Sequence, residues 1–298
     1  MSFLPRNAVL VGLAPPGCDV RLGILGSGSG GNALVVEAGG TTVLFDCGIS
    51  YRQLVTRATE AGFVPGRVGA VFLSHEHDDH VKGLEVFRRH HDVAVLATAG
   101  TAAGMASRPS LAQVLFAGRA VRVGPLEVLP VPISHDAREP VGWVVSYGAQ
   151  RVGIATDTGV VTAALREPLK GCHALLLECN HDRDLLRVGP YPWPLKQRIL
   201  SRTGHLSNDQ AREALEGLMH GGLELVVGMH LSETNNRPAM VRAELESVFA
   251  GTGVSLAIAR QDAPLVVTVG PPAPLSGQLR LFADGEPEAP RAIASRRR

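Results

Sequence analysis

Short apolar runs alternate with glycine and polar breaks along most of this chain. Runs rich in Val, Ile and Leu predict β-strands. They occupy residues 21–26, 32–37, 41–45, 69–74, 125–133, 142–148, 151–156, 173–179, 223–230, 254–259 and 264–269. Apolar residues three or four positions apart predict helices at 51–62, 80–90, 160–169 and 237–250, with residues 182–220 largely helical. This alternation predicts a mixed α/β fold.

The composition favours one folded domain with less regular ends. With 45% hydrophobic and 19% charged residues, the 298-residue chain can bury a large core. We expect a lead-in at 1–19, a catalytic domain at 20–269 and a Pro-rich, disordered tail at 270–298. No apolar run approaches the ~20 residues that span a bilayer. The start lacks a basic leader and a cleavage site, so we expect a cytoplasmic protein with no membrane partner.

Cysteines and net charge narrow the picture less. The four cysteines form no C-x-x-C pair, which favours reduced thiols. The formal net charge of +1 gives no overall attraction to nucleic acid. Any polyanion would therefore have to bind at a local patch.

Three of the 11 histidines fall within six residues, in the segment HEHDDH at 75–80. His75 and His77 are two positions apart, and such residues point to the same side of an extended segment. Two imidazoles on one side, just after a strand, can bind one metal ion. Asp79 and His80 follow where a helix begins and can face a second ion. The alternative is a solvated polar loop, which further ligands elsewhere in the chain disfavour.

Those further ligands follow the ends of later predicted strands, where sites in α/β folds tend to lie. We assign His75, His77 and His135 to the first metal. We assign Asp79, His80 and His230 to the second metal, and Asp157 is expected to bridge the two. Imidazole and carboxylate suit Zn²⁺ and Mn²⁺ alike, so the ligands do not choose the ion. We therefore expect two divalent metal ions as cofactors.

The motifs occur in a recognisable order. They are DCG at 46–48, H-x-H-x-D-H at 75–80, the lone His135, TDTG at 156–159 and the late His230. In this order the sequence resembles the metallo-β-lactamase superfamily over nearly all of residues 20–270. The resemblance implies an αββα sandwich with the di-metal site at the sheet edges. Because superfamily members often dimerise, it is also compatible with a homodimer.

Further segments narrow the resemblance. LGSGSGGNALVVE, GPYPWPLKQRI, GHLSN and HLSETNN resemble the bacterial YycJ/WalJ-like branch of the superfamily. Gly30 stands where that branch usually has Ser. The resemblance implies a DNA exonuclease that acts from 5′ ends, with a role in DNA repair as one interpretation.

The implied mechanism uses a metal-bridging hydroxide that attacks phosphorus in line. Asp79 is expected to orient or deprotonate this nucleophile as well as to bind metal. The leaving alkoxide needs a proton, for which His205 in GHLSN is the first candidate and His181 in CNHD the second. A single loop histidine is more often structural, and the family motif favours His205. Asp46 is expected to support the ligand loops through hydrogen bonds.

Two groups of residues are candidates for substrate binding. Ser27, Ser29 and Asn32 lie in a Gly-rich turn that can offer N–H groups and hydroxyls to a phosphate, although a simple tight turn is the alternative. We also assign Asn180 and Arg198 to the substrate. Around them, residues 180–205 interleave basic and aromatic side chains: Arg183, Arg187, Tyr191, Trp193, Lys196, Arg198 and Arg202.

Such interleaving suits a single-strand channel, whereas two solvated helices joined by a Pro-rich corner are the alternative. The resemblance favours DNA, single-stranded or with a 5′ end, as the partner. Competing functions are a ribonuclease or a small-molecule hydrolase, either a cyclic phosphodiesterase or a thioesterase or lactonase. A compact pocket would favour the small substrate. The full set of seven ligands disfavours a binding protein with a degenerate site.

The tail contains GQLRLF, which resembles the peptide by which bacterial DNA enzymes dock on the replicase sliding clamp. The predicted clamp-binding residues are Gln278, Leu279, Leu281 and Phe282. Leu and Phe would anchor in a pocket while the Gln amide forms hydrogen bonds. Chance occurrence, or packing of this apolar patch on the domain, is the alternative.

Overall fold

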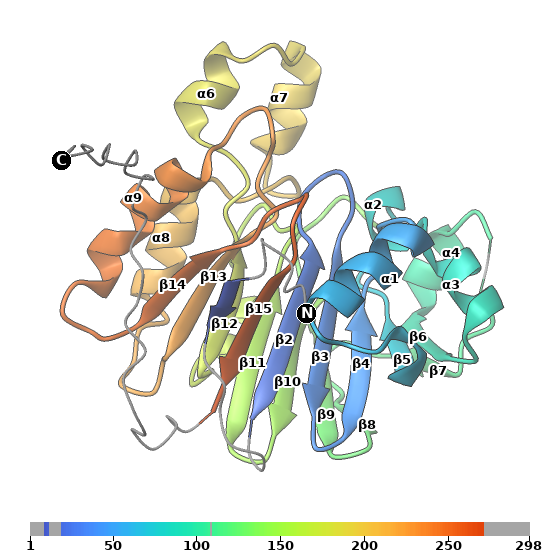
Figure 1. Cartoon of the computed structure of the whole chain (residues 1–298). Coiled ribbons are helices and arrows are strands. Elements are labelled where there is room, and N and C mark those ends of the chain that lie inside the picture. The colour runs from blue at the N-terminus through green and yellow to red at the C-terminus, as the bar shows by residue number, and fades with distance from the viewer. Residues whose placement is uncertain (1–8, 12–18, 108, 271–298) are drawn as a thin grey trace, which may run out of the picture.

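The structure, a computed structural model, describes residues 9–11, 19–107 and 109–270. Two β-sheets pack face to face, and helices lie on both outer faces (Figure 1). The layers follow the order helix, sheet, sheet, helix. The predicted αββα sandwich is therefore confirmed.

The first sheet consists of β1 (Val9–Val11), β2 (Val20–Gly26), β3 (Ala33–Ala38), β4 (Thr41–Phe45), β5 (Val68–Phe72), β6 (Ala94–Thr98), β7 (Gln113–Leu115) and β15 (Leu265–Val269). Their order is β1-β15-β2-β3-β4-β5-β6-β7. The strands from β4 to β7 are parallel. β1 pairs with β15, so part of the expected lead-in at 1–19 adds a strand to this sheet.

The second sheet consists of β8 (Val121–Val123), β9 (Leu126–Pro132), β10 (Val141–Tyr147), β11 (Gln150–Ala155), β12 (Ala174–Glu178), β13 (Leu225–Met229) and β14 (Ser255–Ile258). Their order is β14-β13-β12-β11-β10-β9-β8. The strands from β11 to β14 are parallel, which brings the loops after β11, β12 and β13 to one edge of the sheet.

The helices are α1 (Tyr51–Glu60), the 3₁₀ turn η1 (Pro65–Arg67), α2 (Asp78–Val81), α3 (Leu84–His90), α4 (Ala99–Gly104), α5 (Ala163–Leu169), α6 (Arg183–Val188), α7 (Trp193–Ile199), α8 (Asn208–Glu216) and α9 (Pro238–Phe249). Capping boxes begin two of them, because Ser50 pairs with Gln53 in α1 and Ser207 with Gln210 in α8. α6 and α7 project from one edge of the sandwich (Figure 1).

Three apolar clusters hold the layers together. Between the sheets, the Phe45 ring stacks on Phe72 with centroids 5.1 Å apart and contacts Trp143 at 5.3 Å. Phe87 of α3 is buried between the helices and the first sheet, and Leu245 of α9 is buried between the helices and the second sheet. Because each sheet buries both faces, its central strands are apolar nearly throughout, as the continuous runs in the sequence predict.

Two expectations about local structure need correction. The helix expected at 80–90 is split, because α2 ends at Val81 and α3 begins at Leu84. Between them, Gly83 packs so closely that a Cβ would lie 2.1 Å from the Ile49 carbonyl oxygen. The strands β6, β7 and β8 and the helix α4 were not predicted, since short or Ala- and Thr-rich segments carry little periodicity.

In the described ranges, no helix is long and apolar enough to cross a bilayer. Three cysteines within those ranges are buried free thiols, namely Cys47, Cys172 and Cys179. The predicted clamp-binding residues at 278–282 lie outside the described residues.

Candidate metal centre

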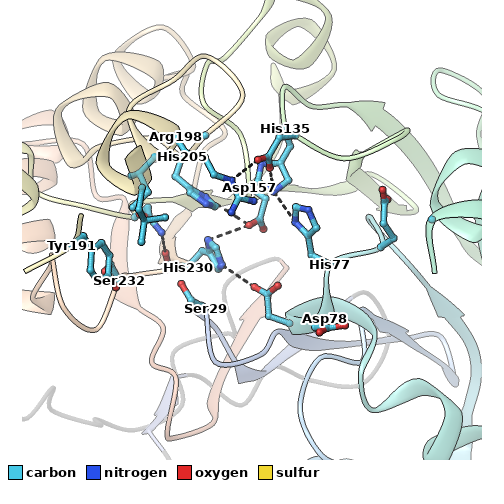
Figure 2. Close-up of a pocket in the computed structure, with 18 residues that line it drawn as sticks. Ser29, His77, Asp78, His135, Asp157, Tyr191, Arg198, His205, His230 and Ser232 are labelled. Carbon is cyan, nitrogen blue, oxygen red and sulfur yellow. Dashed lines mark hydrogen bonds and ion pairs between the residues drawn. The ribbon is translucent and has the colours of Figure 1, made fainter. Parts of the chain in front are cut away.

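The predicted metal ligands gather at the edge from which α6 and α7 project. β5 belongs to the first sheet and β9, β11 and β13 to the second, yet all four end at this edge. The loops after them carry residues 75–80, His135, Asp157 and His230. Figure 2 shows His77, His135, Asp157 and His230 turned toward one another. The fold thus assembles the site from loops far apart in the sequence.

His75, His77 and His135 form a first group. Their donor atoms lie within 4.8 Å of one another, and His135 Nε2 is 3.2 Å from His77 Nδ1. Burial and the neighbouring His80 hold the pKa of His75 well below its ordinary value. Burial also lowers the pKa of His135. Both rings therefore favour the neutral form, which is the form that binds a metal.

Asp79, His80, Asp157 and His230 form a second group, again with donor atoms within 4.8 Å. His80 Nε2 lies 3.3 Å from Asp157 Oδ2 and 3.5 Å from Asp79 Oδ2. Burial opposes the charge on Asp79, but the neighbouring His230 and His80 imidazoles hold its pKa well below the usual range. Asp157 belongs to this group and not to the first one, so its bridging role stays a prediction.

Four buried nitrogen and oxygen atoms that could bind a metal have no hydrogen-bond partner in the described protein. These atoms are His75 Nε2, His135 Nδ1, Asp157 Oδ2 and His230 Nε2. A buried polar atom without a partner costs about 1–3 kcal/mol, so such a cluster needs a compensating ligand. Nitrogen and oxygen donors without a thiolate suit ions such as Zn²⁺ and Mn²⁺. The residues therefore fit divalent metal ions.

Asp46 supports the ligand loops from below the first sheet's edge. Its Oδ1 accepts from the Ser74 N–H at 2.8 Å, and its Oδ2 accepts from the Ser74 hydroxyl at 2.9 Å. Oδ2 also lies 2.8 Å from His80 Nδ1. When this nitrogen donates its proton to Asp46, His80 Nε2 is left with a lone pair directed at the second group.

Glu178, at the end of β12, was not identified from the sequence. It is fully buried, and its Oε1 lies 2.8 Å from both His205 Nδ1 and His230 Nδ1. Its Oε2 accepts from the N–H groups of Thr158 and Leu206 at 2.9 and 3.2 Å. Burial raises the pKa of Glu178, but His205 and His230 outweigh it and lower that pKa to about 2. One carboxylate therefore orients two imidazoles of the site.

Backbone strain is concentrated at this edge. Asp46, Asp157 and His230 have φ angles of 59°, 57° and 56°, and they are the non-glycine residues with positive φ in the described ranges. Such conformations cost on the order of 1–3 kcal/mol and cluster at functional sites. Asp46 and His230 directly follow a strand and Asp157 lies two residues after one, so these turns occur where β4, β13 and β11 end at the site.

A cavity of about 630 Å³ opens over the two groups. It lies within the range of roughly 300–1,000 Å³ that is usual for ligand sites. Of the predicted catalytic and substrate residues beyond the ligands, Ser29, Asn180, Arg198 and His205 line this cavity. Figure 2 shows Arg198 and His205 at the cavity, and Tyr191 and Ser232 also line it.

Three other predicted residues do not line the cavity. The Ser27 hydroxyl accepts from the His230 N–H at 2.7 Å, so it holds a ligand loop. Asn32 Nδ2 lies 3.1 Å from His80 Nε2, beneath the second group. His181 is buried, and neither ring nitrogen has a hydrogen-bond partner in the described protein. Burial lowers the pKa of His181 to about 4.

Several basic side chains of residues 180–205 are engaged within the protein. Arg183 and Arg187 form ion pairs with aspartates of the neighbouring and of their own helix. Lys196 is only 8% exposed and donates to two backbone carbonyls. Arg198 reaches the cavity, where it pairs with Asp136. Among the basic residues of this segment, Arg198 is the one that lines the cavity.

The fold and the clustered His and Asp donors define a metallo-β-lactamase-type hydrolase. The family profile described as Beta-lactamase superfamily domain matches residues 41–231. The chain therefore belongs to the metallo-β-lactamase superfamily.

Within the superfamily, the chain is related to proteins named as exodeoxyribonucleases. Exodeoxyribonuclease YycJ of Bacillus anthracis is 32% identical over 239 residues, which cover 78% of this chain and 90% of that protein. Exodeoxyribonuclease WalJ of Streptococcus pneumoniae is 31% identical over 223 residues, which cover 72% and 83%. The metallo-β-lactamase fold protein YhfI of Bacillus subtilis shares the fold, with a TM-score of 0.66, 16% identity and coverage of 84% and 100%.

Proposed function

We propose that this protein is a di-metal exodeoxyribonuclease that degrades DNA from the 5′ end. The observation that carries the proposal is the pair of donor groups beneath one cavity, in a chain related to two exodeoxyribonucleases. Bacterial DNA repair is the cellular setting that this activity would suit.

The residues proposed to hold the ions are the two donor groups. His75, His77 and His135 would bind one ion, and Asp79, His80 and His230 the other, with Asp157 between them. Once bound, such ions lower the pKa of a water to near neutrality and neutralise charge on a phosphoryl group. Ser29, Asn180 and Arg198 line the same cavity and would position the phosphodiester. Asp79 would also orient the attacking water.

His205 is proposed as the general acid. Hydrolysis forms a P–O bond to the attacking oxygen and breaks the P–O bond to the leaving oxygen, which then needs a proton. His205 Nδ1 is engaged by Glu178, so Nε2 is the nitrogen available to the cavity. Burial disfavours charge on His205, but Glu178 and Asp157 raise its pKa above the ordinary value. A protonated His205 at neutral pH is therefore the expected donor.

A polymeric substrate is supported by the space beside the cavity. A second cavity of about 380 Å³ shares the Glu76 and Asp78 walls with the first. Lys82 and Arg88 line this second cavity, and both are exposed cations. The same cavity is also lined by Glu76, Asp78 and Glu85, so it offers a strand two cations for its phosphates but no net positive charge. The extra space beside the metal cavity is what favours a strand, because a small diester would not need it.

Docking on the sliding clamp is proposed for the tail. Gln278, Leu279, Leu281 and Phe282 carry this part of the proposal, and it rests on the sequence motif.

The proposal is tested with purified protein in defined Mn²⁺ or Zn²⁺. Oligonucleotides labelled at the 5′ or 3′ end, single- and double-stranded, would be incubated beside RNA and bis-p-nitrophenyl phosphate. We expect stepwise loss from the 5′ end of DNA. Asp79→Ala should abolish this loss and lower the bound metal measured by mass spectrometry, whereas the exposed Asp92→Ala should change neither.

Other outcomes would redirect the proposal. Cleavage of the small ester with DNA intact would leave the metal chemistry and move the substrate to a small diester. Preference for RNA would indicate a ribonuclease. Wild-type activity and metal content in Asp79→Ala would contradict the proposed site itself.

A further inference from the structure

One wall of the cavity differs in chemistry from all the others. Tyr191, Leu195 and Ile199, here called the apolar wall, come from α7 and the loop before it. Apart from the glycines 104 and 204, every other residue of the lining is polar or charged. A nucleotide has the same division, with a charged phosphate at one end and an apolar base at the other.

The loop that carries Tyr191 is fixed to α7. Lys196 Nζ donates to the Arg187 and Gly189 carbonyls at 2.7 and 2.8 Å, and this burial of a lysine joins the end of α6 to α7. Pro190 and Pro192 flank Tyr191, and each proline ring fixes its own backbone φ angle. The loop that carries Tyr191 therefore has few alternative conformations. At Gly189 a Cβ would lie 2.5 Å from Asn235 Oδ1, so this turn leaves no room for a side chain.

The apolar wall is also fixed relative to the metal ligands. The His205 N–H donates to the Ile199 carbonyl at 2.9 Å, so the end of α7 joins the loop of the proposed acid. Next to His135, the Ser134 hydroxyl donates to the Arg202 carbonyl at 2.8 Å. The spacing between the wall and the donor groups is therefore set before substrate arrives, which reduces the entropic cost of binding.

We propose that the apolar wall holds the base of the nucleotide being removed, with Tyr191 stacked on it. This inference rests on the proposed nuclease function and specifies its substrate. Because a base paired and stacked in a duplex cannot reach this wall, the substrate is an end whose terminal base is unstacked, as in a single strand or a frayed duplex. Stacking is tolerant of sequence, since every base has a π-face.

The same segment supplies a matched control. Trp193 is 62% exposed and does not line the cavity, although it lies only two residues from Tyr191. Trp193 begins α7 and Leu200 caps its end, seven positions apart, on the side opposite Leu195. A strand channel running over the whole segment would use both aromatic residues, whereas the apolar wall uses Tyr191 alone.

The test is steady-state hydrolysis of single-stranded DNA by wild type, Tyr191→Ala, Tyr191→Phe and Trp193→Ala. Each DNA would be prepared with a normal or an abasic 5′-terminal nucleotide. For the normal end we expect Tyr191→Ala to raise KM on the order of 10- to 100-fold, the size of a base–aromatic stacking contact. Tyr191→Phe and Trp193→Ala should remain near wild type. With the abasic end, wild type and Tyr191→Ala should differ by less than about 2-fold.

An equal rise in KM for DNA with normal and with abasic 5′ ends would contradict base binding by the apolar wall, and so would equal effects of Tyr191→Ala and Trp193→Ala. Either result would leave the nuclease function intact. If wild type leaves DNA intact, the nuclease proposal fails instead. Calorimetry with thymidine 5′-monophosphate on the metal-loaded protein then tests whether the apolar wall binds a base. Weakened binding in Tyr191→Ala but not in Trp193→Ala would support it, and unchanged binding in both would reject it. Melting curves would show that each variant is folded.

Discussion

Glu178 connects the proposed acid to the metal ligands through a single oxygen. Its Oε1 holds both His205 and His230, and its Oε2 is held by two backbone N–H groups. Glu178→Gln keeps the shape but loses the charge that favours both imidazole orientations. We expect activity or metal affinity to fall about 10- to 100-fold, as is typical when a group behind a metal ligand is removed. Kinetics and metal titration would measure this loss.

The control for this change is Glu213→Gln, at an exposed position on α8. It should leave kcat, KM and metal content unchanged. Glu178→Gln should also move the alkaline limb of the pH–rate profile to lower pH, because His205 must be protonated to act as the acid and would lose the carboxylate that raises its pKa. A variant with reduced stability and an unaltered pH profile would show that Glu178 serves packing only.

His181 makes a prediction about acid stability. Its pKa is lowered by burial to about 4, against about 6.5 in an unfolded chain. Its contribution is therefore present above pH 6.5 and is lost as the pH falls toward 4, by about 3 kcal/mol in all. His181→Leu should flatten this part of the curve, because no proton is taken up at that position on unfolding.

Urea unfolding between pH 7 and pH 4 would measure this difference, with chelator present so that metal release makes no contribution. His220→Leu, at a partly exposed position, is the control for the replacement of a histidine by leucine. Identical slopes for wild type and His181→Leu would show that His181 binds its proton equally well in the folded and the unfolded chain, which contradicts the lowered pKa.

The sequence alone indicated the histidines and aspartates of the two donor groups, but not Glu178, which orients two imidazoles of the site. The spacing of His75, His77, Asp79 and His80 fixes their neighbourhood locally, so this motif could be read directly. Glu178 could not, because its partners lie 27 and 52 residues away. A glutamate that ends an apolar strand carries no signal until the fold shows which imidazoles it meets. Ser27 and Asn32 do not line the cavity for which they were predicted, because their partners His230 and His80 are also distant in the sequence.

At the scale of elements, glycines decide how closely the ligand loops approach. Gly48 follows β4, and a Cβ there would lie 1.7 Å from the Asp79 carbonyl oxygen. The Asn32 N–H donates to the same oxygen at 2.7 Å, so the contact cannot simply open. Gly48→Ala should therefore lower the free energy of unfolding by at least about 1–3 kcal/mol and displace Asp79.

Loss of bound metal and a lower denaturation midpoint would report this displacement. Gly69→Ala in β5 is the matched control, since a Cβ there meets nothing within 4 Å. Its stability should stay within about 0.5 kcal/mol of wild type. If Gly48→Ala retains full metal content, the α2 loop can shift without losing the site.

Element prediction succeeded where periodicity was strong and failed where contacts between elements decide. The apolar runs before residues 75, 135, 157 and 230 identified the strands that end at the site. The break between α2 and α3 depends on Gly83 meeting the Ile49 carbonyl, which no local pattern encodes. The position of α7 over the cavity likewise depends on Lys196 and on the loop of His205.

At the scale of the molecule, the two ends of β15 lie at opposite edges of the sandwich. Leu265 pairs with Ile24 near the site, because β2 continues to Ser27 beneath His230. Val269 pairs with Val20 at the far edge. The described chain therefore ends, at Gly270, away from the metal residues, and within the described residues the cavity is lined by residues from the range 29–232.

This geometry predicts that catalysis and clamp docking are separable. A chain ending at Gly270 should keep its metal content and its kcat/KM on free DNA within about 2-fold of wild type, since it loses no residue of the cavity. It should lose binding to the cognate sliding clamp in calorimetry, and so should the full chain with Leu281→Ala and Phe282→Ala, because their side chains are the proposed anchors. Arg280→Ala is the control within the motif. Clamp binding that survives truncation would assign the docking surface to the folded domain, and lost activity on free DNA would assign the tail a part in substrate binding.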